Sequence, residues 1–277
     1  MNNDLKIRLI PILLIKDGVI VRSRGFEYYQ VTGNPFEQVK RFNSWNVDEL
    51  IYLDISRKGM IDIENSDSNI GFTSSGKKVF NKKIYRIENF VEYLSEKCFM
   101  PLAFGGGLNN INQIRNILKS GADKVVINTT AYYNPKIITD CAKLFGSQSL
   151  IVSIDYKKVQ DKNIVFIEGG SKKTKSSALE WAKEIQDLGA GEILINSIDR
   201  DGFGNGYDLE FYKELVDNIN IPIIICGGVG RMEHFSIGYN TIKPHALAAA
   251  NIFHFIEHSD KVIKKHLHDH GINVRFS

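Results

Sequence analysis

Short runs of Ile, Leu and Val alternate along the chain with longer stretches whose apolar residues recur at helical spacing. Most of the short runs lack polar alternation, which is typical of strands buried on both faces of a parallel sheet. We expect strands at residues 8–14, 49–55, 100–104, 124–127, 150–154, 192–196, 221–225 and 246–250. We expect helices at residues 35–45, 87–97, 111–120, 135–145, 178–188, 208–218, 232–239 and 260–270.

Eight strands in strict alternation with eight helices predict an α/β protein with a (β/α)8 barrel, the TIM barrel. The alternative is an open doubly wound sheet. That fold would place a G-x-G-x-x-G phosphate loop after an early strand, and no such loop is evident there. The length of 277 residues suits one barrel, so we expect a single domain over residues 1–277.

An internal sequence repeat predicts a duplicated half-barrel. The glycines at 105–107 follow the strand at 100–104, and those at 227–230 follow the strand at 221–225, half a chain later. Residues 57–83, rich in Ser, Asn, Gly and Lys, form an inserted loop after the second strand. In a barrel this loop lies at the end where sites are built, so it is either a lid or partner contact or a disordered insertion.

Composition changes this picture mainly by exclusion. The chain has 35 Lys and Arg against 32 Asp and Glu, and a formal net charge of +3 is too weak to indicate a nucleic-acid partner. Its three cysteines are far apart and form no C-x-x-C pair, so a zinc site or disulfide framework is not expected and a reducing cytoplasm fits best. The apolar run at 9–15 is too short for a signal peptide or a membrane span.

Small residues follow several expected strands, where successive backbone N–H groups can form a nest for an anion. One group contains Gly107, Asn128 and Thr129. The other, from the second half-barrel, contains Asp201, Gly202, Gly228, Ala250 and Asn251. Barrels often bind phosphate with the loops of their last strands, so two nests predict a ligand with two phosphates or comparable anionic ends. The structural alternative is that these glycines only make tight turns.

Asp155 directly follows the strand at 150–154, which places its carboxylate at the mouth of the barrel as a candidate general acid or base. The structural alternative is a helix cap or a loop salt bridge. The histidines crowd the C-terminal helix without metal-ligand spacing, and no serine or cysteine nucleophile arrangement is evident. We therefore expect neither a metal nor a cofactor.

Four charged residues stand at strand starts, which lie on the bottom of a barrel. Arg8, Glu49, Lys124 and Glu192 begin the first, second, fourth and sixth strands. Two cations and two anions could close a ring of salt bridges over the barrel axis and gate a small polar molecule. The simpler interpretation is surface charge, which contributes about 0–1 kcal/mol per pair.

The chain resembles the cyclase subunit of imidazole glycerol phosphate synthase over nearly its whole length, apart from residues 57–83. The most specific phrase is Ser-Ile-Asp-Arg-Asp-Gly at 197–202, and other matching phrases lie at 10–11, 16–18, 48–50, 53–55, 105–107, 121–125, 145–148, 189–193, 206–208, 232–235, 253–255 and 271–275. The resemblance implies a (β/α)8 barrel that docks a glutaminase subunit on its bottom face. Ammonia then passes through the barrel to a bisphosphorylated nucleotide at the top.

The resemblance also implies residue roles. Asp155 matches the second of two catalytic aspartates, and Asp123 matches the glutaminase interface. The family's salt-bridge gate is matched by Arg8, Glu49, Lys124 and Glu192. One phosphate site is matched by Gly107, Asn128 and Thr129, and the other by Asp201, Gly202, Gly228 and Ala250, with Asn251 at a position that is usually serine.

The first catalytic aspartate of the family is replaced. Leu14 stands at its position, and leucine cannot move a proton. A basic residue of the family that follows soon after is also replaced, by Arg22, and arginine does not substitute freely for lysine. This departure resembles homologues from surface-polysaccharide clusters, associated with acetamidino modification of sugars, in which barrel and glutaminase supply ammonia to a separate sugar amidotransferase. The first hypothesis is therefore an ammonia-channelling barrel for a surface sugar. The alternatives are the cyclase (a lyase) of histidine biosynthesis and a non-catalytic scaffold that binds a phosphorylated metabolite.

Overall fold

Eight parallel strands close into a barrel. The computed structural model describes residues 5–45, 47–56, 70–72, 78–80, 86–255 and 258–276. Around the barrel the strand order is β1 (Arg8–Lys16), β4 (Leu50–Asp54), β7 (Leu102–Gly105), β8 (Lys124–Ile127), β9 (Leu150–Val159), β12 (Glu192–Ser197), β13 (Ile223–Cys226) and β14 (Ala246–Ala249), which pairs again with β1. The pairing of β8 with β9 completes the ring, so the TIM-barrel prediction is confirmed and the open-sheet alternative is wrong.

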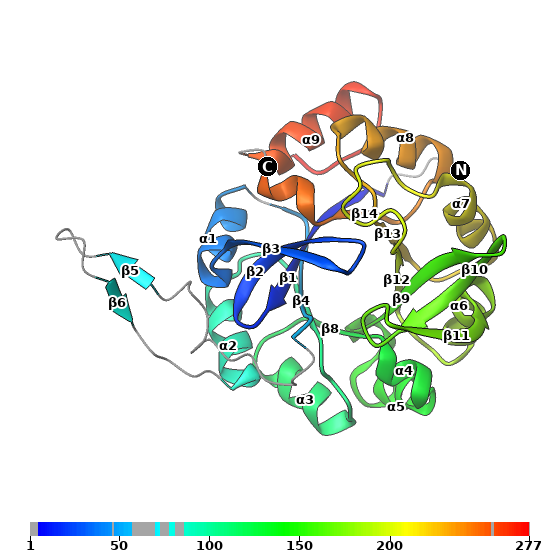
Figure 1. Ribbon diagram of the computed structural model, residues 1–277, viewed down its shortest axis with the longest axis horizontal. Coiled ribbons are helices and arrows are strands. Elements are labelled where there is room, and N and C mark those ends of the chain that lie inside the picture. The colour runs from blue at the N-terminus through cyan, green and yellow to red at the C-terminus, as the bar shows by residue number, and fades with distance from the viewer. Residues whose placement is uncertain are drawn as a thin grey trace.

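Helices surround the cylinder on its outside (Figure 1). They follow the amphipathic stretches of the sequence and comprise α1 (Pro35–Trp45), α2 (Ile87–Lys97), α3 (Ile111–Lys119), α5 (Lys136–Phe145), α6 (Ala178–Asp187), α7 (Leu209–Asn218), α8 (Met232–Ile242) and α9 (Ser259–Asp269). Ser177 caps α6 by accepting the backbone N–H of Glu180 at 3.2 Å. Gly121 and Gly189 follow α3 and α6 with φ of 99° and 95°, the left-handed conformation that ends a helix without steric cost.

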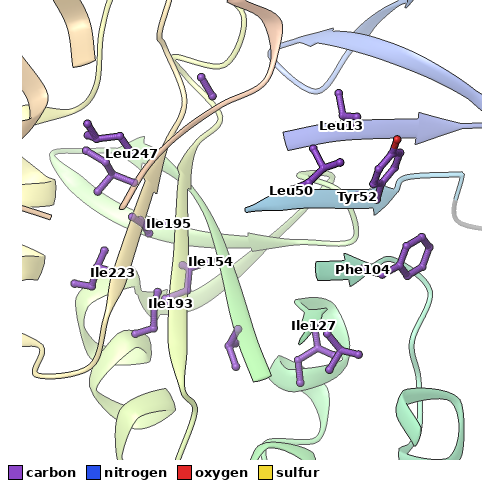
Figure 2. Close-up of a cluster of buried hydrophobic side chains, with 14 of the residues drawn as sticks. Leu13, Leu50, Tyr52, Phe104, Ile127, Ile154, Ile193, Ile195, Ile223 and Leu247 are labelled. Atoms are coloured by element: carbon purple, nitrogen blue, oxygen red, sulfur yellow. The ribbon is translucent and has the colours of Figure 1, made fainter. Parts of the chain in front are cut away.

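Strand alternation divides the buried apolar side chains into two layers. The outward-facing layer, which includes Leu13, Tyr52 and Ile193, packs against the helices, and Figure 2 shows part of it. The inward-facing residues form a separate cluster along the barrel axis, made of Ile10, Ile12, Ile51, Ala103, Val126, Ile151, Leu194, Ile224, Cys226, Ala246 and Ala248. We call this second set the axial cluster.

Two antiparallel hairpins extend barrel strands at the mouth, and the sequence analysis missed both. The first consists of β2 (Val19–Arg24) and β3 (Tyr28–Gly33) after β1, and the second of β10 (Lys162–Ile167) and β11 (Lys172–Ser177) after β9. In Figure 1 the β2–β3 hairpin runs across the front of the barrel opening. The hairpins follow the first and fifth barrel strands, and the glycine runs follow the third and seventh. Equivalent features four strands apart agree with a duplicated half-barrel.

The insertion predicted at 57–83 is described only in part. Its described residues form β5 (Ile70–Phe72) and β6 (Lys78–Phe80), which pair with each other as a two-stranded antiparallel sheet. The remaining residues of the insertion lie outside the described part of the chain, so its role as a lid or partner contact stays a prediction. The described part of the chain also contains the short segments α4 (Thr129–Tyr133), η3 (Ser147–Ser149) and η4 (Asn251–His254). Among the helices described, none is both long enough and apolar enough to span a bilayer.

A buried ion pair fastens the last helix to the bottom of the barrel. Lys264 of α9 donates to Asp48 at 2.8 Å, and the other Asp48 oxygen accepts the backbone N–H of Leu9 at 2.9 Å. The Lys264 and Asp48 side chains are only 4% and 7% exposed. This pair could not be predicted from the sequence, because its members are far apart in the chain.

Replacing Lys264 with methionine would leave the Asp48 charge buried without its cation. We expect Lys264→Met to lower the free energy of unfolding by about 3–5 kcal/mol, as measured by urea denaturation. The matched control is Lys265→Met on the exposed side of the same helix, which should change it by less than about 0.5 kcal/mol. Equal losses in the two variants would contradict a stabilising role for the buried pair.

Candidate functional site

The four charged residues predicted at strand starts meet at the floor of the barrel. Arg8 donates to Glu49 and to Glu192, each at 2.7 Å. Lys124 Nζ lies 3.0 Å from Glu49 and 2.5 Å from Glu192. Each cation therefore bridges both anions, and the four side chains form a closed ring, which we call the floor ring. Contacts of this kind distinguish it from scattered surface charge.

Contacts within the floor ring favour the charged forms of Arg8 and Glu192. Burial by itself would lower the pKa of Arg8, but hydrogen bonds and charge attraction from Glu192 and Glu49 outweigh it, and the pKa is raised. Burial would likewise raise the pKa of Glu192, but its bonds to Arg8 and Lys124 lower it instead. Asp123 lies next to the ring, is exposed, and accepts the backbone N–H of Leu102 at 2.8 Å.

Apolar side chains fill the axis above the ring. On β8 the residue two positions after Lys124 is Val126, and on β12 the residue two positions after Glu192 is Leu194; both belong to the axial cluster. Alternate residues of a strand face the same way, so each strand leads from a charge at the floor to an apolar side chain on the axis. Such an interior disfavours ions strongly and a small neutral molecule much less.

A cavity of about 550 Å³ opens at the mouth of the barrel, above the axial cluster. The polar lining residues on strands β9 and β12 and directly after β8 are Asn128, Ser153, Asp155 and Asn196. The cavity wall on β1, β4 and the end of β14 is mainly apolar and includes Ile12, Leu14, Leu53 and Ala250, with the carboxylate of Asp54 at the end of β4. The cavity therefore has two chemically different sides, and the replacement at Leu14 lies on the apolar one.

Asp155 is the acid–base group of the polar wall. Its side chain accepts a hydrogen bond from Asn128 Nδ2 at 2.7 Å, and the residue is 8% exposed. Burial raises the pKa of Asp155 to about 7; the neighbouring Asp201 carboxylate adds to the rise, while the amides of Asn128 and Asn196 oppose it. A carboxyl group with such a pKa can both accept and release a proton near neutral pH.

The two predicted anion nests differ in their surroundings. Gly107, Asn128 and Thr129 line the cavity together, as do Asp201 and Ala250 of the second nest. Gly202, Gly228 and Asn251 are not among the described residues that line it. A Cβ on Gly202 would lie 2.2 Å from the Ser23 carbonyl oxygen, and one on Gly228 would lie 2.1 Å from that of Gly206. These two glycines thus serve close backbone packing in this structure.

The β2–β3 hairpin contacts the second nest directly. Ser23 donates its hydroxyl to Asp201 at 2.6 Å, and the backbone N–H of Gly25 donates to the Asp201 carbonyl at 2.9 Å. Asn251 donates to the Ser23 carbonyl at 2.8 Å. Sequence analysis did not identify Ser23 as a site residue, because it did not recognise the hairpin that carries it.

The charged side chains among the described lining residues are all acidic: Asp54, Asp155, Glu168 and Asp201. Burial raises the pKa of Asp54 and of Asp201, against the hydrogen bonds that each accepts. Arg22 is not among the described residues of the wall, and its guanidinium lies 5.0 Å from the Phe255 ring centre. A phosphate bound by these residues would therefore depend on neutral donors, namely backbone N–H groups and the hydroxyl and amide side chains of the wall. In the part of the chain described, no three His, Cys, Asp or Glu residues are grouped to hold a metal ion.

Comparison with known proteins gives a consistent result. A family model of histidine biosynthesis proteins matches residues 81–259. The chain is 38% identical over 268 residues to imidazole glycerol phosphate synthase subunit HisF of Chlorobium phaeovibrioides (strain DSM 265 / 1930), covering 97% of this chain and 98% of the relative. It is 40% identical over 275 residues to the protein of the same name from Clostridium botulinum (strain Kyoto / Type A2), with the same coverage of both chains.

Proposed function

Because the chain belongs to the family of HisF subunits of imidazole glycerol phosphate synthase, we propose that it is the barrel subunit of such a glutamine-dependent complex. In this proposal a glutaminase on the bottom face releases ammonia, and the barrel carries it to a bisphosphorylated nucleotide at the mouth, where an imidazole ring is closed. The observation that supports it best is the succession along one axis of the floor ring, the axial cluster and the cavity with Asp155.

Exposed apolar side chains near the floor ring support a docked partner. Leu5 precedes β1 and is 76% exposed, and Phe99 precedes β7 and is 87% exposed. Phe276 is also exposed, two residues after Val274, which bridges to Ile7 beside β1. Large exposed apolar residues around a polar entrance are typical of protein interfaces. Asp123 lies at the same end of the barrel and is proposed as part of this interface.

At the mouth, Asp155 is proposed to exchange the protons that ring closure requires. Gly107, Asn128 and Thr129 would bind one phosphate. Asp201, Gly202, Gly228, Ala250 and Asn251 would bind the other, mainly through backbone N–H groups. Because Ser23 donates to Asp201, we expect the hairpin to shift when a phosphate occupies the second nest.

The decisive experiment supplies the purified chain with an ammonium salt and the bisphosphorylated nucleotide, and measures formation of imidazole glycerol phosphate. A parallel reaction replaces the ammonium salt with glutamine and the glutaminase subunit. Product in both reactions supports the proposal. The absence of product in both, from a folded chain that binds the glutaminase, contradicts a cyclase role.

A second candidate function rests on Leu14. Without the aspartate expected there, the barrel would deliver ammonia to a separate sugar amidotransferase for acetamidino modification of a surface sugar. The similarity to HisF subunits favours the cyclase, whereas the apolar wall around Leu14 favours this delivery role. Complementation of a histidine auxotroph separates them, since growth requires ring closure in the cell.

Opening the floor ring should uncouple the glutaminase from the barrel. Arg8→Ala removes the hydrogen bonds from Arg8 to both glutamates, leaving Lys124 as the remaining cation of the ring. We expect glutamine-dependent product formation to fall about tenfold while the ammonium-dependent rate is largely retained, because each lost charged hydrogen bond is worth about 1.5–3 kcal/mol. Arg115→Ala on the exposed side of α3 is the control. Equal losses with glutamine and ammonium would argue against a gate.

A further inference from the structure

The side-chain carbonyl oxygen of Asn196 is a buried acceptor without a hydrogen-bond partner among the described residues. Asn196 lies on β12 two residues after Leu194 of the axial cluster and four after Glu192 of the floor ring. It therefore faces inward where the apolar axis opens into the cavity, and it lines that cavity. A buried acceptor left without a donor costs free energy, so it indicates a ligand that donates to it.

Asp155 lies directly beside Asn196. Strands β9 and β12 pair in parallel with Asn196 opposite Asp155, and Asn128 on the other side donates to the same carboxylate at 2.7 Å. One carboxylate thus lies between two carboxamides on the polar wall. On the opposite wall the inward-facing residues Ile12, Leu14 and Leu53 offer no hydrogen-bonding side chain, and the carboxylate of that wall is Asp54 at the end of β4.

Close packing holds the Asn196 side chain in this place. A Cβ on Gly227 would lie only 2.7 Å from Asn196 Oδ1 and 3.0 Å from the Ser197 carbonyl oxygen. Gly227 has a φ of 96°, a conformation that favours glycine. The loop after β13 therefore leaves room for this carboxamide and limits its movement. Sequence analysis placed Gly227 only in the glycine run at 227–230 and did not connect it with Asn196.

We infer that Asn196 Oδ1 and the Asp155 carboxylate together bind the nitrogen nucleophile where it leaves the axis. The ligand is a small neutral amine, ammonia, which donates one N–H to the Asn196 carbonyl and a second to Asp155. Its lone pair then faces the cavity and the bound acceptor. The inference rests on the proposed function, since ammonia is what the axis is proposed to conduct. Asn196 is a positioning residue for the nucleophile.

Nuclear magnetic resonance of the ¹⁵N-labelled full chain tests this binding without turnover. Ammonium chloride is titrated at alkaline pH, where part of it is ammonia, and potassium chloride is titrated in parallel. We expect the Asn196 side-chain amide and the Asp155 backbone amide to shift saturably with ammonium chloride alone. The exposed Asn205 amide is the internal control and should respond to neither salt. Equal responses to the two salts would overturn the inference.

Variants at position 196 sharpen the test. Asn196→Leu keeps the branched shape of the side chain but removes the acceptor, and should weaken the ammonium response of Asp155 about tenfold, as expected for one lost hydrogen bond. Asn196→Ser keeps a smaller acceptor and should retain part of the response, which also covers the case that Asn196→Leu does not fold. An unchanged response of Asp155 in the folded Asn196→Leu variant would overturn the inference.

Kinetics separate this inference from the proposed function. In an active complex, Asn196→Leu should raise the KM for ammonium about tenfold and leave the KM for the phosphorylated substrate unchanged. A purely structural role would raise both. A chain that forms no product yet shows the ammonium-specific shifts would contradict the cyclase but support the amine site. A chain that turns over without those shifts would overturn the amine site alone.

Discussion

Asp155→Asn is expected to lower turnover by about 10²–10⁴-fold with either glutamine or ammonium as nitrogen source, because a positioned general acid or base contributes about that factor. Asparagine keeps the size of the side chain and its contact with Asn128, but it cannot exchange a proton. Steady-state rates of imidazole glycerol phosphate formation measure the effect. The matched control is Asp199→Asn, on the exposed loop after β12, which should retain wild-type turnover.

The pH dependence of the rate and of the stability gives an independent test of the same variant. The pKa of Asp155 is raised by burial to about 7, so its ionisation changes the wild-type rate around neutral pH, and Asp155→Asn should remove that inflection. In the unfolded chain the pKa is about 4, so between about pH 4 and pH 7 folding favours the protonated form. The wild-type chain therefore loses stability as pH rises through this window. Asp155→Asn should be the more stable protein at pH 8.

The loss of turnover and the gain in stability of Asp155→Asn together distinguish a catalytic role of Asp155 from a structural one. A group retained for its chemistry is expected to cost stability, and its removal lowers turnover while raising the melting temperature. If Asp155→Asn kept wild-type turnover in the assembled complex, the pocket would not use this carboxylate. The scaffold hypothesis, in which the barrel only binds a phosphorylated metabolite, would then be favoured.

The barrel could be predicted from the sequence because its strands are buried on both faces and therefore appear as unbroken apolar runs, such as those of β12 and β13. The floor ring could be anticipated because four of those runs begin with a charged residue or directly follow one. The β3 and β11 strands could not be predicted in this way. Their sequences, YYQVTG and KKTKSS, are largely exposed and carry no apolar alternation.

The site residues could be predicted only where the residue type itself indicates a chemical role. The aspartate at 155 and the glycine runs stand out in the sequence, so they could be named. Asn196 could not, because a carboxamide after an apolar run also suits a turn, and its importance comes from the register of β9 with β12. The contact of Ser23 with Asp201 likewise depends on a hairpin that joins residues far apart in the chain.

Leu14→Asp is expected to raise ring-closing turnover by about 10²–10⁴-fold if the barrel is a cyclase whose first acid–base group has been lost. Leu14 and Asp155 lie on the first and fifth barrel strands, equivalent positions of the two half-barrels, and both line the same cavity. A carboxylate at position 14 would therefore approach a bound ligand from the side opposite Asp155. The rate with saturating ammonium and nucleotide measures the effect without the glutaminase.

The new charge is also expected to lower the stability of the protein, and a second variant with the same loss of stability serves as the control. Leu14 is partly buried among apolar neighbours, so an unpaired carboxylate there should lower stability by about 1–3 kcal/mol. Leu53→Asp places the same group on the paired residue of β4, in the same apolar wall, and should show the loss of stability without the gain in rate. A folded Leu14→Asp variant with no gain would mean that the missing aspartate is not what limits ring closure. Ammonia leaving the axis would then serve an acceptor held elsewhere, because the polar wall would still receive the nucleophile while a carboxylate restored at position 14 did not close a ring.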